Sequence, residues 1–482
     1  MPPKFRSFIR SKIIAMLVVL SATIRFHIWP TNKICKGMMM QGFIPLPRAT
    51  LFSMAFLVAL VLMGCGPDEP EAPAAKPEIE LRIIADNNRS PIADEVARRY
   101  EESNPTITLK NEAWGAWPRT YLEGEEPPDL LTIGPADWLF SVIDDNLVAD
   151  ITGIWEETTL SDTYPPELQV LTQRGGKHYF LPTGYGWFAV YYNRAVFQQY
   201  GLTPPDSWDD LMQIAETLVL NGETPFALPM GWEWNAAFWF DYINLRLNGP
   251  EFHRMLTNGE ISFTDERVRN ALATWQFLFD QGYFIQNGSV RSNMDMLGSI
   301  IRGDSKSPIT RHKAVMALTS PDNLADFPLV FRNELGFFRF PIINPEIPTG
   351  ELVATGGLIV SANAPNRLEA IEYMKFIVSP EIQEVVAQGV GSEDMFVPIQ
   401  SDFDSLPTEV QDGAQIIQAA DGLSLPIFWG TPVEMRVKLE SGVSKFLRGI
   451  TSDRVELDID EILGTLEEAR LTALTDGAFG TQ

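Results

Sequence analysis

Cysteine and histidine are scarce in this 482-residue sequence, which contains two of the first and four of the second. Cys35 lies before a long apolar run and Cys65 ends it, so these two residues do not form a disulfide framework for a folded domain. The histidines are spread widely along the chain: His27, His178, His253 and His312. A zinc site would need three such distant ligands to converge. We therefore predict no metal and no cofactor.

Positive charge is also in short supply, with 37 Lys and Arg against 63 Asp and Glu. Eight of the basic residues and none of the acids precede Cys65, so 29 basic residues remain after it and the formal charge there is near −34. Such a surface repels the phosphates of nucleic acids and of anionic lipids. The composition therefore argues against nucleic acid as a partner.

The common catalytic motifs are missing. The sequence has no G-x-S-x-G, no H-E-x-x-H, no P-loop and no G-x-G-x-x-G pattern. With 63 acids in the chain, candidate carboxylate pairs for glycoside cleavage are so common that no single pair is informative. We predict that the protein is not an enzyme, and a secreted carbohydrate-active hydrolase stays open as an alternative.

The most informative segment that is present is the uncharged run Leu51–Gly64, which follows Arg48 and ends at Cys65. It is too short for a permanent membrane helix but suits the apolar region of a secretion signal. We predict a signal region over residues 1–64, with an over-long start, and lipid attachment at Cys65. Residues 66–78 hold four prolines and four acids and predict a flexible tether. The protein is then anchored to a membrane outside the cytoplasm.

From Ile79 onward, short apolar runs alternate with amphipathic segments, which predicts an α/β fold. Strands are predicted at 79–85, 107–109, 129–134, 312–319, 335–340 and 357–361, with little strand signal afterwards. Ser90-Pro91 predicts the start of a helix that ends at Asn104-Pro105. Residues 137–144 predict a short helix, and caps at Ser207 and at residues 264–266 open two longer ones.

Three aromatic clusters lie in loop-like, glycine- or proline-flanked contexts. They contain Trp114 and Trp117, then Tyr185 and Trp187, then Trp232 and Trp234 with Glu233 between them. Aromatic faces stack on the C–H faces of sugar rings, while nearby polar groups bind the hydroxyls. A tryptophan in a helical stripe, such as Trp239 or Trp275, instead predicts core. The loop clusters predict a sugar site, with the filling of seams between lobes as the alternative.

Several segments, in order, resemble the extracellular solute-binding proteins of ABC importers, in particular the sugar-binding group similar to maltose-binding protein. The segments are Ile92–Asn104, Pro128–Leu130, Gly176–Asn193, Pro205–Leu211, His312–Ser320, Thr355–Ser361, Asn366–Phe376 and Ser379–Glu381. The resemblance covers the chain from Ile79 to about Leu474. Residues 294–311 depart from the pattern, because Gly303–Pro308 looks inserted.

The resemblance implies a two-lobed, type II periplasmic-binding-protein-like α/β fold that traps solute by closure about a hinge. We expect one lobe from 79–188 and 320–378, and the other from 189–319 and 379–474. The implied partners are a carbohydrate and ABC permease subunits, and we expect a monomer. Together with the aromatic clusters, the expected ligand-binding residues are Trp114, Trp117, Asp137, Tyr185, Trp187, Trp232, Glu233, Trp234, Asp241, Ser320, Gly356, Gly357 and Trp429.

A non-sugar solute such as a polyamine remains an alternative, because Asp137, Glu233 and Asp241 lie near the tryptophans in sequence and would hold cations. For the sugar site, we expect Trp232→Ala or Trp187→Ala to weaken solute binding by about 1–3 kcal/mol with the fold intact.

Overall fold

The computed structural model describes residues 78–85, 91–134, 137–285, 292–301, 314–325, 329–389, 396–399, 403–451 and 457–479. The predicted signal region, Cys65, nearly all of the tether, Ser90 and the segment Gly303–Pro308 lie outside these ranges. No helix in the described ranges is both long enough and apolar enough to cross a membrane.

The first β-sheet combines strands from distant parts of the chain. Across the sheet the order is β12 (Val397–Pro398), β6 (Leu181–Trp187), β11 (Gly350–Val360), β3 (Leu130–Ile133), β1 (Ile79–Ala85) and β2 (Ile107–Ala113), and β13 (Gly422–Ser424) pairs with β11. β1 runs parallel to β2 and β3, whereas β11 runs antiparallel to β3 and β6. The strands predicted at 79–85, 107–109 and 129–134 are confirmed. β12 and β13 were missed because two or three residues carry no periodic pattern.

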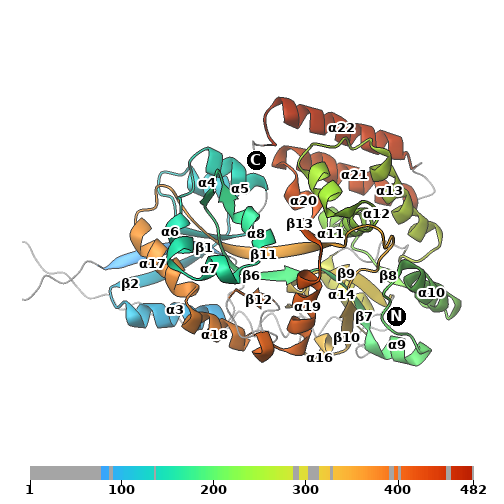
Figure 1. Cartoon of the computed structure of the whole chain (residues 1–482), viewed down its shortest axis with the longest axis horizontal. Coiled ribbons are helices and arrows are strands. Elements are labelled where there is room, and N and C mark those ends of the chain that lie inside the picture. Colours follow the sequence, from blue (N-terminus) through green and yellow to red (C-terminus); the bar gives the residue numbers. More distant parts are fainter. Residues whose placement is uncertain are drawn as a thin grey trace, which may run out of the picture. The chain divides into compact units, whose positions relative to one another are not determined.

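Helices from both ends of the chain pack around this sheet. They are α3 (Pro91–Ser103), α4 (Pro118–Leu122), α5 (Asp137–Asp144), α6 (Thr152–Glu157), α7 (Leu160–Thr163), α8 (Pro166–Gln169), α17 (Arg367–Ile377), α18 (Pro380–Gly389) and α19 (Thr408–Gln418), with a small hairpin of β4 (Gln173–Arg174) and β5 (Lys177–His178). α3 begins at Pro91 and ends before Asn104, as predicted. It lies beside α18 (Figure 1), and its Tyr100 ring is 4.8 Å from that of Tyr373.

The second sheet has the order β10 (Leu335–Phe338), β7 (Ala189–Asn193), β9 (Met316–Thr319) and β8 (Phe226–Ala227). Its helices are α9 (Arg194–Tyr200), α10 (Trp208–Leu220), α11 (Glu233–Ala236), α12 (Phe238–Thr257), α13 (Glu266–Asp280), α14 (Asn293–Ile300), α15 (Asp322–Ala325), α16 (Leu329–Arg332), α20 (Ile427–Gly430), α21 (Val433–Thr451) and α22 (Ile459–Thr475). The predicted caps are confirmed, since Ser207 accepts a hydrogen bond from the Asp210 amide and Asp265 from the Arg267 amide.

The chain passes between the two sheets three times. Phe188 separates β6 from β7, residues 339–349 lead from β10 to β11, and residues 419–426 lead from α19 through β13 to α20. Sheet membership divides the chain differently from the expected lobe boundaries. β10, placed at 320–378 with the first lobe, pairs with β7 in the second sheet. α18 and α19, placed with the second lobe, pack against α3 and β6 of the first.

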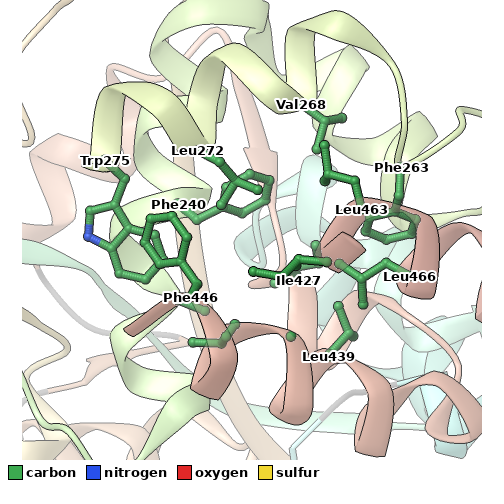
Figure 2. Close-up of a pocket in the computed structure, with 14 residues that line it drawn as sticks. Phe240, Phe263, Val268, Leu272, Trp275, Ile427, Leu439, Phe446, Leu463 and Leu466 are labelled. Atoms are coloured by element: carbon green, nitrogen blue, oxygen red, sulfur yellow. The ribbon is translucent and has the colours of Figure 1, made fainter. Parts of the chain in front are cut away.

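An apolar cavity of about 40 Å³ lies among α12, α13, α21 and α22. Figure 2 shows its lining, in which Phe240, Leu272, Phe446 and other apolar side chains converge. The predicted helical stripe of α13 is confirmed as core, because Val268 and Trp275 are almost fully buried here. The residues that line it are apolar and offer no polar side chain to orient a hydroxylated solute, so we do not assign it as the solute site.

Gly442 of α21 allows the cavity to be filled. A methyl group on Gly442 would lie 3.5 Å from Ile462 Cγ2 and from Leu466 Cδ2, which is ordinary van der Waals distance. We expect Gly442→Ala to raise the free energy of unfolding by about 1.5–2 kcal/mol, from helix propensity and one buried methyl. The control is Gly464→Ala in α22, whose methyl would meet nothing within 4 Å and should add only about 1 kcal/mol. Equal gains in urea unfolding would show that the cavity is not filled.

Candidate functional site

Three tryptophans form a row on the elements of the second sheet. Trp232 directly precedes α11, Trp234 lies in α11, and Trp429 lies in α20. The ring centroids are 5.6 Å apart between Trp232 and Trp234 and 6.4 Å apart between Trp234 and Trp429. Trp232 is 40% exposed and the other two are partly exposed. Phe188 and Phe238, both fully buried, contact Trp429 and support the row.

A second aromatic group belongs to the helices of the first sheet. Trp117, at the start of α4, is 45% exposed and its ring is 6.1 Å from that of Trp138 in α5. Trp114 is partly buried and its ring lies edge-on to Tyr121 at 5.6 Å. The Arg436 guanidinium of α21 lies 5.6 Å from the centre of the Trp117 ring. Because α21 packs against α11, this contact brings the two aromatic groups to neighbouring elements.

Two charged side chains accompany the exposed rings. Glu233, partly buried, is the first residue of α11 between two indoles of the row. Arg436 has no ion pair to any other side chain in the part of the chain that the structure describes, so its N–H donors are available beside Trp117. Flat rings with one acceptor and one donor beside them suit a ligand with apolar faces and hydroxyl edges.

Four of the predicted ligand-binding residues are instead buried. Trp187 is fully buried, with its ring 5.7 Å from that of Phe337, and Tyr185 is 6% exposed. Asp241 and Ser320 are 0% and 2% exposed. Trp187 and Tyr185 sit on β6, where alternate side chains point into the core on both faces of a covered sheet. We leave these four out of the proposed binding surface, because their side chains offer a solute little accessible surface.

The remaining predicted positions to be placed are Gly356, Gly357 and Asp137. Gly356 and Gly357 lie inside β11, not in a loop, and their register with β6 is irregular. A Cβ on Gly357 would collide with the Leu181 carbonyl, so this glycine serves strand pairing and not approach to a ligand. Asp137 is the first residue of α5, and its side chain lies outside the described part of the structure.

One buried polar cluster on helix α12 forms hydrogen bonds with the main chain of two of the passages between the sheets. The Arg246 guanidinium donates to Glu351 Oε1 at 2.5 Å and to the Phe340 carbonyl at 2.9 Å, and it also contacts the Gly350 carbonyl. The Tyr242 hydroxyl lies 3.0 Å from both Glu351 Oε2 and the Phe188 carbonyl. Arg246 and Glu351 are at most 1% exposed. Burial raises the pKa of Glu351, and the Arg246 charge opposes that rise.

Asp241 and His253 of α12 contact the third passage. Asp241 Oδ2 accepts a hydrogen bond from the Ile427 amide at 3.2 Å, and His253 Nε2 lies 3.2 Å from the Leu425 carbonyl. Asn244 Nδ2 lies 3.1 Å from His253 Nδ1, so the imidazole carries its proton on Nε2. Burial raises the pKa of Asp241 well above its usual value and lowers the pKa of His253 to about 4. The His253 imidazole is therefore uncharged near neutral pH.

The model for the family described as bacterial extracellular solute-binding protein matches residues 86–384, more than half of the chain. The chain belongs to this family. The resemblance predicted from the ordered segments is thereby confirmed.

Solute-binding proteins similar to this chain include an ABC transporter extracellular-binding protein of Pyrococcus horikoshii, 26% identical over 45% of this chain and 53% of that protein. Another is the multiple sugar-binding protein of Streptococcus mutans, 23% identical over 63% of this chain and 74% of the relative. The first match thus spans about half of the relative's length.

Among solved structures, a chitin oligosaccharide binding protein matches with a TM-score of 0.68 and 19% identity, over 82% of this chain and 99% of that one. Likeness at this level establishes the two-lobed α/β fold of the solute-binding proteins and confirms the predicted fold class.

Two residues of the aromatic surface were missed from the sequence of this solute-binding protein. Trp138 adjoins the predicted Asp137 in the sequence, and its contact with Trp117 is visible only in the structure. Arg436 gave no signal, because α21 carries several basic residues and only its packing on α11 brings this one to Trp117. Within the described ranges, no group of three His, Cys, Asp or Glu side chains is placed to hold a metal ion.

The buried pair predicts how stability changes with pH. Because the folded pKa of Asp241 is raised, its contribution to the free energy of unfolding is largest below its unfolded pKa of 3.8 and decreases as the pH rises. His253, with a folded pKa of about 4, acts oppositely and loses stability as the pH falls from 6.5 towards 4. We expect Asp241→Asn to gain stability relative to the parent as the pH rises from 3.8 to the raised folded pKa of Asp241, by at most about 1.4 kcal/mol per pH unit within that window and no further above it. The free energy of unfolding in urea would contradict this prediction if its pH profiles ran parallel in the parent and in Asp241→Asn.

Proposed function

We propose that this protein is the lipid-anchored solute-binding component of an ABC importer, and that its solute is a carbohydrate. The row formed by Trp232, Trp234 and Trp429 is the observation that carries the proposal, because adjacent exposed indoles suit successive sugar rings. The names of the Streptococcus sugar-binding relative and of the chitin oligosaccharide binding protein support the same solute class.

The proposed binding surface joins the aromatic groups of both sheets. Sugar C–H faces would stack on the indole row and on Trp117, with Trp114 and Trp138 behind Trp117. Glu233 would accept from hydroxyls and Arg436 would donate to them. The solute is held without any bond being broken, and closure follows because the closed lobes contact it on both sides while the open form contacts it on one. The closed form would then deliver the solute, unaltered, to membrane permeases.

The two alternative functions, polyamine binding and sugar hydrolysis, would each require different chemical groups on the same surface. A polyamine would have to approach a wall that already carries the Arg436 guanidinium, which repels a dication. A hydrolase would need two carboxyl groups placed across a bound sugar, and Glu233, between Trp232 and Trp234 in the sequence, supplies one. Both observations favour neutral sugar binding.

A thermal-shift screen tests the proposal directly. The chain from residue 66, without the signal region, is heated with galactose, raffinose, xylotriose, chitotriose, putrescine or spermidine, and chromogenic glycosides are assayed for turnover. A sugar present at a hundred times its dissociation constant should add about 2.7 kcal/mol of stability. A shift with polyamines alone, or release of chromophore, would overturn the proposal. Membrane fractionation of the full chain and of Cys65→Ser tests the anchor, since the variant should leave the membrane fraction.

Loss of an exposed indole should weaken binding while leaving the fold intact. We expect Trp232→Ala to weaken the affinity for the best sugar of the screen by about 1–3 kcal/mol, since the ring loses its stacking face. Isothermal titration calorimetry measures the effect. Phe277→Ala in α13 is a matched control, because that ring is 44% exposed but belongs to another helix. Equal affinity in parent and Trp232→Ala would remove this residue from the site.

A further inference from the structure

The position of Trp429 depends on a short segment that has little structure of its own. α20 is a single turn, Ile427–Gly430, and follows Leu425 and Pro426. Its internal hydrogen bonds are those of one turn, such as the bond from the Trp429 amide to the Pro426 carbonyl at 2.8 Å. An isolated turn of this length is not stable in water. Something outside α20 must therefore hold Trp429 beside Trp234.

Helix α12 supplies that support from three positions. Asp241 accepts from the Ile427 amide, which is one of the amides at the start of α20 without a partner inside the turn. His253, which lies beyond the kink of α12 at Gly249 and Pro250, donates to the Leu425 carbonyl. Thr257 closes the other end, since a Cβ on Gly430 would lie 3.2 Å from Thr257 Cβ. The three contacts fix the main chain on both sides of the tryptophan.

Because these contacts are largely shielded from solvent, the loss of one of them is costly to this arrangement of the main chain. Asp241 and His253 are both 0% exposed and lie 3.9 Å apart between Oδ1 and Nε2. The hydrogen bond from the Ile427 amide to Asp241 is buried, so this amide would have no water to replace its partner, whereas the bond between His253 and the Leu425 carbonyl is partly buried. The turn would have to move to satisfy those groups, and Trp429 would move with it.

We propose that Asp241 and His253 are positioning residues that hold the Leu425–Ile427 main chain against α12 and thereby align the Trp429 indole with Trp234 for the solute. This inference rests on the proposed function for its meaning in binding. It replaces the direct ligand contact expected for Asp241 from the sequence with an indirect role.

Fluorine NMR tests the positioning without any solute. The protein is labelled with 5-fluorotryptophan, and the Trp429 and Trp117 resonances are assigned by their loss in Trp429→Phe and Trp117→Phe. In Asp241→Leu, which lacks the acceptor for the Ile427 amide, we expect the Trp429 resonance to shift or broaden and the Trp117 resonance to stay. Asp241→Asn keeps an acceptor oxygen and should preserve both resonances.

Two further variants serve as a control and as a replacement in this test. Leu211→Ala removes a fully buried side chain of α10 in the same core and should leave the Trp429 resonance in place. If Asp241→Leu does not fold, His253→Phe takes its place, because it removes the donor to Leu425 and keeps a ring of similar size. An unchanged Trp429 resonance in whichever of the two folds would overturn the proposal.

A double-mutant cycle connects positioning to solute binding, with chitotriose as the probe. We expect Asp241→Leu to weaken its affinity roughly tenfold in the parent and less than twofold in Trp429→Ala, because the tryptophan is then no longer there to be misplaced. Equal losses in both backgrounds would mean that Asp241 acts through general stability alone. If neither chitotriose nor any other sugar of the screen binds, the proposed function fails, while the fluorine spectra still decide the positioning role.

Discussion

Arg246→Met is expected to lower the free energy of unfolding by about 3–5 kcal/mol. The substitution leaves Glu351 buried without its countercharge, and it also removes the donors to the Phe340 and Gly350 carbonyls. Glu351 can take up a proton, but its burial among Tyr242 and the passage between the sheets keeps the loss large. Urea unfolding of parent and variant, followed by far-UV circular dichroism, measures the effect.

The double variant Arg246→Met/Glu351→Leu separates the ion pair from the carbonyl contacts. Removing both charges ends the penalty of an unpaired carboxylate, so the double variant should be more stable than Arg246→Met alone. It should remain less stable than the parent, because the two carbonyls still lack their donors. If the double variant loses as much free energy of unfolding as the single variants Arg246→Met and Glu351→Leu lose together, Arg246 and Glu351 do not stabilise each other.

Trp187→Ala is expected to destabilise the first lobe by about 3–5 kcal/mol, which corrects the sequence-based expectation that the fold would stay intact. The indole is fully buried, and a Cβ on Gly413 of α19 would collide with it, so α19 packs directly on the ring. Truncation would leave a large cavity between β6 and α19. Denaturant unfolding of Trp187→Ala and Trp232→Ala, side by side, gives the comparison.

The two tryptophans should therefore separate stability from binding. Trp232 is 40% exposed, and its loss should change the free energy of unfolding by less than about 1 kcal/mol while weakening sugar binding. In Trp187→Ala, by contrast, the main effect should be a loss in the free energy of unfolding. If Trp187→Ala unfolds at the parent's urea concentration and only its sugar affinity falls, the ring contacts solute rather than supporting α19.

The sequence predicted most regular elements because their signals are local. The α3 start at Pro91, the Ser207 and Asp265 caps and the strand at Ile79–Ala85 each follow from a few adjacent residues. The exposed tryptophans were also found, since glycine and proline beside Trp117 and Trp232 mark loops.

Burial in the site was harder to predict, because it depends on what packs against a residue from elsewhere in the chain. Tyr185-Gly186-Trp187 looked like a loop from its glycines, but Gly186 is small because the Phe396 ring lies against it within the sheet. Asp241 looked like a polar ligand contact, and only the approach of the Leu425–Ile427 turn makes it a buried hydrogen-bond acceptor. Both errors concern partners more than 150 residues away in the chain.

By itself, the sequence determined the family and the α/β fold class and predicted the aromatic residues of the proposed binding surface, because these depend on ordered local segments and on composition. The tertiary structure decided which tryptophans are exposed, which helices cover which sheet, and that α12 contacts every passage between the sheets. The physical reason is that burial and hydrogen-bond pairing are set by long-range packing, for which a single sequence contains no local signal.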